Sequence, residues 1–89
     1  MKESEIERRC KVIAENLGYK VRKMEAINCR GFPDRLFLKK GRAFFVEFKT
    51  PQGVISELQK IHIEDLKQSG LEVYIIKTIE EFEEILINE

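Results

Sequence analysis

Residues 43–49, with the sequence AFFVEFK, constrain the fold of this chain more than any other segment. Aromatic and β-branched residues dominate the segment, which predicts a β-strand. Glu47 and Lys49 interrupt the apolar pattern, and because side chains alternate between the faces of a strand, both charges lie on one face. An exposed ion pair of little energetic weight would explain them. Their apolar neighbours instead indicate a buried strand, and buried charges require a partner or a function.

Hydrophobic periodicity and turn residues predict the elements around this strand. An amphipathic helix carries the stripe Ile6, Cys10, Ile13 and Leu17 and ends at Gly18. We predict strands over residues 19–27, 34–38, 43–49 and 72–77, and helices over residues 56–70 and from residue 78 or 79 onward. The order αβββαβα describes an α/β fold, a mixed β-sheet flanked by helices. Its second and third strands form a hairpin, and the second helix is a crossover between two strands.

The same pattern predicts which side chains of the later elements are buried. The apolar side of helix 56–70 carries Leu58, Ile61, His62 and Leu66. The apolar run 73–76 indicates a strand that is buried on both faces of the sheet. In the last helix Phe82, Ile85 and Leu86 are expected to face inward.

Length and composition exclude several classes of protein. The 89 residues suffice for one domain over residues 1–89, and the 43% hydrophobic and 36% charged residues are typical of a globular chain. No apolar run approaches the ~18 residues of a membrane span, and the charged N-terminus does not resemble a signal peptide. We therefore expect a cytoplasmic protein without membrane contact. Cys10, on the apolar stripe, and Cys29, in a loop, lack the spacing of a zinc site, and no disulfide is expected.

Charge is distributed unevenly along the chain although its net value is zero. Residues 1–42 hold 12 Lys and Arg against 6 Asp and Glu, whereas residues 43–89 hold 4 against 10. This asymmetry indicates a basic face toward a polyanion, or else an ordinary solvated surface whose charges sort by position. The candidates for phosphate contacts are Arg30, Arg35, Lys20, Arg22, Lys39, Lys40 and Arg42.

Two carboxylates of the hairpin can meet across its strands. Asp34 begins one strand and Glu47 lies near the end of the other, so an antiparallel pairing brings them together. Paired carboxylates bind hard divalent cations, and phosphodiester hydrolysis uses such a cation to offset charge on the phosphate. Lys49, two residues beyond Glu47, could hold the attacking water or stabilise the transition state.

Three motifs in order, Gly31-Phe32-Pro33-Asp34, Glu47-Phe48-Lys49 and Ser56-Glu57-Leu58-Gln59, resemble the VRR-NUC (virus-type replication and repair nuclease) branch of the PD-(D/E)XK superfamily. The likeness runs from the first helix to Ile76 and covers nearly the whole chain. It implies a restriction-endonuclease-like core and a stand-alone DNA endonuclease. Family members of this size look like cutters of branched DNA, such as four-way junctions, that work as homodimers in the cytoplasm of a bacterium or a virus-infected cell.

The resemblance also implies roles for individual residues. Asp34 and Glu47 would bind Mg²⁺ or Mn²⁺ with the backbone carbonyl of Phe48, and Lys49 would be the catalytic lysine. Gln59 would match the active-site glutamine of the family. Glu7 would be the acidic residue that the first helix contributes in related resolvases, with Glu3 as the alternative.

Several of these roles have structural alternatives. Two pairs have the spacing of a capping box: Ser56 with Gln59, and Ser4 with Glu7. In a capping box the side chain of Gln59 or Glu7 would bind the backbone N–H of its serine and stabilise the start of a helix. His62, the single histidine, is expected to be a packed, hydrogen-bonded residue rather than a base.

The proposed activity has alternatives as well. A non-catalytic DNA-binding module of the same fold would bind DNA in a salt-sensitive way without cleaving it. A nicking or flap nuclease would work as a monomer. An RNA-directed nuclease is the third alternative, although the strands show no aromatic platform for stacking bases.

Overall fold

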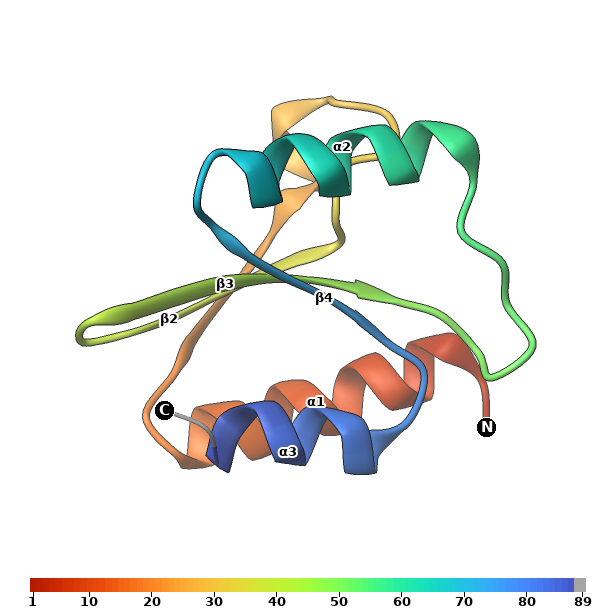
Figure 1. The fold of residues 1–89 in the computed structure, drawn as a ribbon. Helices are drawn as coiled ribbons and strands as arrows, with labels where there is room; N and C mark the ends of the chain where they lie inside the picture. The colour runs from red at the N-terminus through yellow and green to blue at the C-terminus, as the bar shows by residue number, and fades with distance from the viewer. Residues whose placement is uncertain (88–89) are drawn as a thin grey trace.

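A four-stranded sheet with helices on both faces forms the structure, a computed structural model that describes residues 1–87 apart from the side chains of residues 26 and 27 (Figure 1). The helices are α1 (Glu3–Asn16), α2 (Glu57–Gln68) and α3 (Ile79–Ile87), with a short 3₁₀ helix η1 (Met24–Ile27). The strands are β1 (Lys20–Lys23), β2 (Arg35–Lys39), β3 (Arg42–Phe48) and β4 (Glu72–Ile76). The predicted order αβββαβα is confirmed.

The sheet has the strand order β1-β2-β3-β4 and is mixed. β1, β2 and β3 are antiparallel neighbours, whereas β4 runs parallel to β3. A parallel pair requires a crossover, and α2 supplies it on the face opposite α1 and α3 (Figure 1). The predicted hairpin and crossover are therefore both present.

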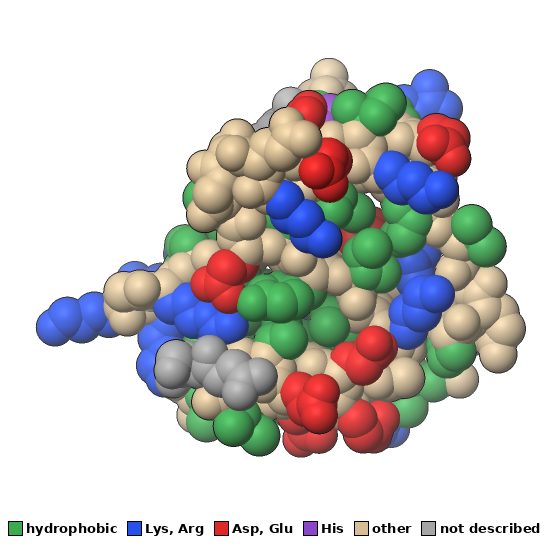
Figure 2. Space-filling view, viewed as in Figure 1, with side chains coloured by type: hydrophobic (Ala, Val, Ile, Leu, Met, Phe, Trp, Pro, Cys, Tyr) green, Lys and Arg blue, Asp and Glu red, His purple; other side chains and the backbone are tan. Residues whose placement is uncertain are grey.

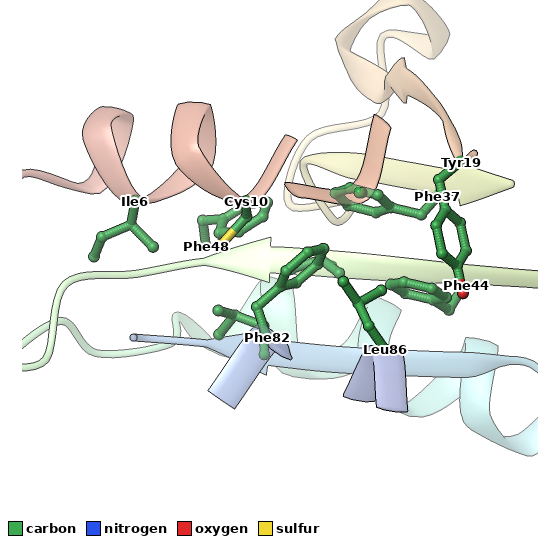
Figure 3. Packing of buried hydrophobic residues seen from close by; sticks show 11 residues of the cluster. Ile6, Cys10, Tyr19, Phe37, Phe44, Phe48, Phe82 and Leu86 are labelled. Carbon is green, nitrogen blue, oxygen red and sulfur yellow. The ribbon is translucent and has the colours of Figure 1, made fainter. Parts of the chain in front are cut away.

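The main core lies between the sheet and the helices α1 and α3 (Figure 3). Alternate residues of β3 point into it, and Phe44 stacks on Phe37 of β2 with ring centroids 5.2 Å apart. Phe82 of α3 packs on Phe37 from the helix side at 5.1 Å. Cys10 is fully buried in this core, as predicted, and burial raises the pKa of its thiol to about 12, so the thiol stays protonated and unreactive.

The face of the sheet toward α2 is less well covered, and three burial predictions were wrong there. On α2, Leu58 is 40% exposed and Ile61 is 56% exposed, whereas Ile63, which the predicted stripe omits, is buried. Ile75 of β4 is 37% exposed because β4 is an edge strand rather than a central one. In α3, by contrast, Phe82 and Leu86 are buried as predicted.

The predicted strand over residues 19–27 ends early, because η1 replaces its second half. Lys23 pairs with Arg35, the first residue of β2, and the Met24 N–H still bonds to the Asp34 carbonyl at 3.0 Å. Before Asp34 the neighbouring chain is the loop through Pro33, which has no N–H to offer a ladder. The chain therefore leaves the sheet at Met24.

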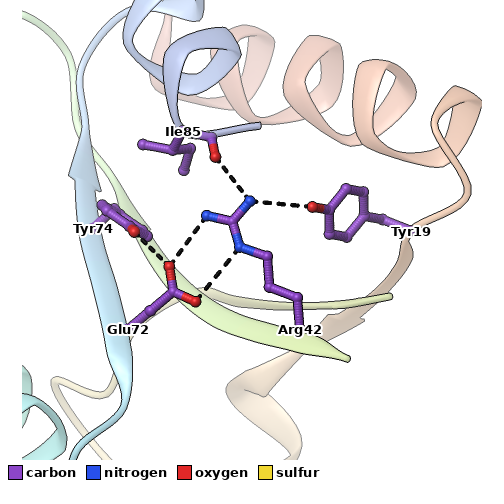
Figure 4. A network of polar contacts seen from close by, with 5 residues as sticks. All are labelled: Tyr19, Arg42, Glu72, Tyr74 and Ile85. Carbon is purple, nitrogen blue, oxygen red and sulfur yellow. Dashed lines mark hydrogen bonds and ion pairs between the residues drawn. The ribbon is translucent and has the colours of Figure 1, made fainter. Parts of the chain in front are cut away.

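Arg42, at the start of β3, ties several elements together (Figure 4). Its guanidinium donates to Glu72 of β4 at 3.1 Å, to the Ile85 carbonyl of α3 at 2.8 Å and to the Tyr19 hydroxyl at 3.3 Å. Tyr74 donates to the same Glu72 carboxylate at 2.6 Å. These contacts hold Arg42 inside the fold, so its position does not fit the predicted phosphate contact.

Candidate active site

Asp34 and Glu47 face each other at one end of the β2–β3 hairpin. Arg35 pairs with Val46, so the next position outward along the two strands places Asp34 opposite Glu47. The Phe48 N–H donates to Asp34 Oδ2 at 3.0 Å and fixes the orientation of that carboxylate. The predicted meeting of the two carboxylates is thus a consequence of the strand register.

Glu47 is almost completely buried, with 3% of its side chain exposed. Its Oε2 accepts a hydrogen bond from Gln59 Nε2 at 3.1 Å and lies 4.0 Å from Lys49 Nζ. Its Oε1 is buried and has no hydrogen-bond partner among the residues that the structure describes. An unpaired buried carboxylate oxygen is costly, so the arrangement calls for a cation or a proton at this point.

The electrostatics of the pair lead to the same conclusion. Burial, and then the negative charge of Asp34, raise the pKa of Glu47 to about 8, although Lys49 opposes the shift. The pKa of Asp34 is also raised, chiefly by burial, while the Phe48 N–H lowers it. Two neighbouring carboxylates that resist joint ionisation are the setting in which a divalent cation replaces a proton.

The donor set fits a hard cation that keeps much of its coordination for water and substrate. Within residues 1–87 no group of three or more Asp, Glu, His and Cys side chains is arranged to hold a metal ion. Asp34 and Glu47 are two carboxylates that face each other at this end of the hairpin. Mg²⁺ is commonly bound through one or two carboxylates, with waters and phosphate oxygens completing its shell.

Gln59 caps α2 and also contacts the carboxylate pair, so it makes the contacts of both roles that the sequence left as alternatives. Its Oε1 accepts from the Ser56 N–H at 2.9 Å, and its own N–H donates to Ser56 Oγ at 3.1 Å, which completes the capping box of α2. Its Nε2 remains free to bind Glu47. The cap therefore orients the amide toward the carboxylate pair.

The acidic residues of α1 differ in their environments. Glu7 forms an ion pair with Arg35, and its charge raises the pKa of Asp34. Glu3, one turn closer to the N-terminus, contributes to the raised pKa of Glu47, and its own pKa is raised by burial and by Asp34. The predicted capping box of Ser4 and Glu7 was wrong, because α1 begins at Glu3 with Lys2 as an N-cap that has no side-chain hydrogen bond.

The basic residues predicted to contact phosphate do not form one surface. Lys39 and Lys40 lie at the hairpin tip, and the length of β2 puts Lys39 about 17 Å from Asp34 along the strand. Figure 2 shows basic side chains gathered around this tip, whereas acidic ones cover α3. Lys20 pairs with Leu38 at the same end of the sheet, Lys39 lies over the Tyr19 ring, and Arg35 is bound to Glu7. The exposed residues of the set outside this tip are Arg22 on β1 and Arg30 in the loop before Gly31.

The loop before β2 packs closely against α2. Gly31 has a φ of +81°, which residues with a Cβ rarely adopt, and a Cβ built on it would lie 2.7 Å from Leu58 Cγ. Both the backbone conformation and the close contact therefore favour glycine at this position. The His62 ring packs against the Phe32 ring with centroids 5.9 Å apart, and its Nε2 lies 3.7 Å from Cys29 Sγ. This matches the packed histidine that the sequence predicts. A pocket of about 300 Å³ beside this loop is lined by Glu7, Lys23, Met24, Glu25, Cys29, Phe32, Pro33 and Asp34.

Comparisons with known proteins place this fold among nuclease-type domains that process DNA. The family model of the VRR-NUC domain matches residues 3–78, and the chain therefore belongs to the VRR-NUC family. A solved structure described as a VRR_NUC domain is similar to it with a TM-score of 0.86 and 26% sequence identity, over 97% of this chain and 95% of that one. No curated protein matches the chain. Within residues 1–87 no helix has the length and apolar character needed to cross a membrane.

Proposed function

We propose that this domain is a divalent-cation-dependent endonuclease that hydrolyses phosphodiester bonds of branched DNA, such as four-way junctions. The observation that carries the proposal is the buried Oε1 of Glu47, which has no hydrogen-bond partner within the described part of the chain and belongs to a carboxylate pair with Asp34 beside Lys49. A module that only binds DNA has no need of two carboxylates next to a polyanion, because they repel it.

Asp34, Glu47 and the backbone carbonyl of Phe48 would hold Mg²⁺ or Mn²⁺. A cation bound there supplies charge neutralisation at the phosphate and a water of lowered pKa. The chain itself orients the ligands: the Phe48 N–H holds Asp34, and Gln59 holds Glu47. Such supporting hydrogen bonds fix ligand geometry.

Lys49 would act on the reacting groups. Its side chain lies on the same strand face as Glu47 and is only 19% exposed, so its charge is weakly screened by solvent. From this position it would orient the attacking water or stabilise the negative charge that develops on the phosphate. Glu3 is the better candidate for an acidic contribution from α1, because the charge of Glu7 is balanced by Arg35.

The preference for branched DNA and a role in repair or recombination rest on the resemblance to stand-alone members of the family. One chain offers one candidate site, whereas resolving a junction requires two symmetric cuts. We therefore propose a homodimer with two-fold symmetry.

Cleavage of an end-labelled four-way junction with Mg²⁺ tests the proposal. Wild type is expected to cut at paired sites, while Asp34→Ala is expected to be inactive and still folded. Light scattering of the protein with the junction should give two chains per complex. Equal cleavage by both proteins would overturn the proposed site, and salt-sensitive binding without cleavage would favour the non-catalytic module. Nicks or flap cuts made by a monomer would favour a nicking or flap nuclease.

The two roles of Gln59 can be separated with two variants of the same capping box. Ser56→Ala removes one capping hydrogen bond and should cost about 1 kcal/mol of stability while cleavage is retained. Gln59→Ala also removes the hydrogen bond to Glu47 and should slow cleavage by about 10–100-fold. Thermal unfolding and single-turnover rates measure the two effects. Equal cleavage rates in both variants would reduce Gln59 to a helix cap.

A further inference from the structure

A second pocket, of about 330 Å³, opens between α1 and β1 beside the candidate active site. It is lined by Ser4, Glu7, Arg8, Lys11, Lys23 and Arg35. We propose that this pocket binds a backbone phosphate of the DNA strand next to the one that is cleaved. The inference rests on the proposed function and assigns a binding role to Arg8, Lys11 and Lys23, none of which the sequence analysis selected.

The charge of the pocket is positive once its internal pairs are considered. Arg35 and Glu7 neutralise each other and are only 17% and 19% exposed. Lys23 contacts Glu25 at 3.2 Å, but both side chains are more than half exposed, so this pair is weak and can give way to a stronger anion. Arg8 and Lys11 have no hydrogen bond or ion pair with any residue that the structure describes. The pocket therefore offers unpaired cations.

The arrangement of these donors suits a phosphate diester. Ser4, Arg8 and Lys11 are spaced by four and three residues, which places them on one side of α1. Lys23 lines the pocket from the end of β1. A guanidinium, ammonium groups and a hydroxyl then converge on one concave surface, and phosphate oxygens accept hydrogen bonds from all three kinds of donor.

The pocket adjoins the pocket of the candidate active site, because two residues line both. Glu7 and Lys23 belong to this pocket and also to the pocket of about 300 Å³ that reaches Asp34. A DNA strand whose scissile phosphate lies at Asp34 can therefore place a neighbouring phosphate between α1 and β1. Lys39 and Lys40, at the far end of β2, are too distant for that position.

Binding of a fluorescent four-way junction without divalent cation tests the inference. The variant Arg8→Gln/Lys11→Gln is compared with Lys60→Gln/Lys67→Gln, which removes the same charge from the surface of α2. The α1 variant should bind about tenfold more weakly than wild type, and the slope of log K against log salt should fall by about one. The α2 variant should stay within about twofold of wild type, because neither of its lysines lines the pocket.

The outcomes separate this inference from the proposed function. If the α1 variant and wild type have equal affinity and equal salt slope, the pocket is not a phosphate site. Equal losses of affinity in the α1 and α2 variants would also overturn the proposal, because such losses would reflect net charge alone. Binding is measured without divalent cation and so without cleavage. A wild type that does not cleave DNA would refute the proposed nuclease activity but would leave the binding result for the pocket intact.

Discussion

Replacing Glu47 by glutamine is expected to raise the thermal stability of the metal-free protein at pH 8 and to abolish DNA cleavage. In the folded chain the pKa of Glu47 is about 8, against an ordinary value of 4.5, because of burial and Asp34. The folded state thus binds this proton more tightly than the unfolded state does. Stability that is complete below pH 4.5 is lost as the pH rises through about 8. An amide at this position has no charge to desolvate.

Thermal unfolding at pH 5 and pH 8 measures the effect. At pH 8 we expect Glu47→Gln to melt on the order of 5–10 °C above wild type, a difference that should nearly vanish at pH 5. Mn²⁺ or Mg²⁺ should stabilise wild type at pH 8 but not the variant. Glu57→Gln is the matched control, since it removes a carboxylate from the exposed start of α2. If wild type and Glu47→Gln lose stability equally between the two pH values, the buried carboxylate is not the cause.

Lys49→Met is expected to slow single-turnover cleavage by about 10²–10⁴-fold, the range typical of a lost acid–base or charge-stabilising group. The ammonium 4.0 Å from Glu47 Oε2 is the positive side chain that the structure places beside the carboxylate pair. Methionine keeps the length and apolar stem of lysine, so folding should be preserved. Because Lys49 lowers the pKa of Glu47, its loss should also raise that pKa further in the metal-free protein.

Two measurements keep this effect apart from a loss of binding. Lys49→Met should still gain thermal stability from Mn²⁺, since Asp34 and Glu47 remain. It should also bind the junction within about threefold of wild type, since it removes only one positive charge. Lys60→Met, on the exposed side of α2, should cleave like wild type. A Lys49→Met rate within threefold of wild type would remove the lysine from the proposed mechanism.

Local patterns were sufficient for the order of elements and for the centre of the candidate site. Periodicity of 3.6 and 2 residues identified α1, the β2–β3 hairpin and the crossover helix α2, because each element buries one face of its own sequence. The site followed from the hairpin alone, since antiparallel pairing sets Asp34 opposite Glu47 and strand alternation sets Lys49 beside it. Only short-range geometry is needed for both conclusions.

Contacts between distant segments could not be obtained in this way. Arg42 meets Glu72 and Arg35 meets Glu7 across about thirty residues, so two arginines that look like free cations in the sequence are internal partners in the fold. Likewise the spacing of Ser56 and Gln59 predicts a cap but says nothing of Glu47, which reaches the same glutamine from another element.

The sequence by itself therefore determined the α/β order, the family resemblance and the facing pair of Asp34 and Glu47 with its lysine. Tertiary structure alone decided that Oε1 of Glu47 is buried with no partner among residues 1–87, that Glu7 is balanced by Arg35, and that α1 and β1 enclose a basic pocket. The physical reason is that periodicity and register act within an element or a hairpin, whereas burial, pKa shifts and ion pairing depend on which elements pack together.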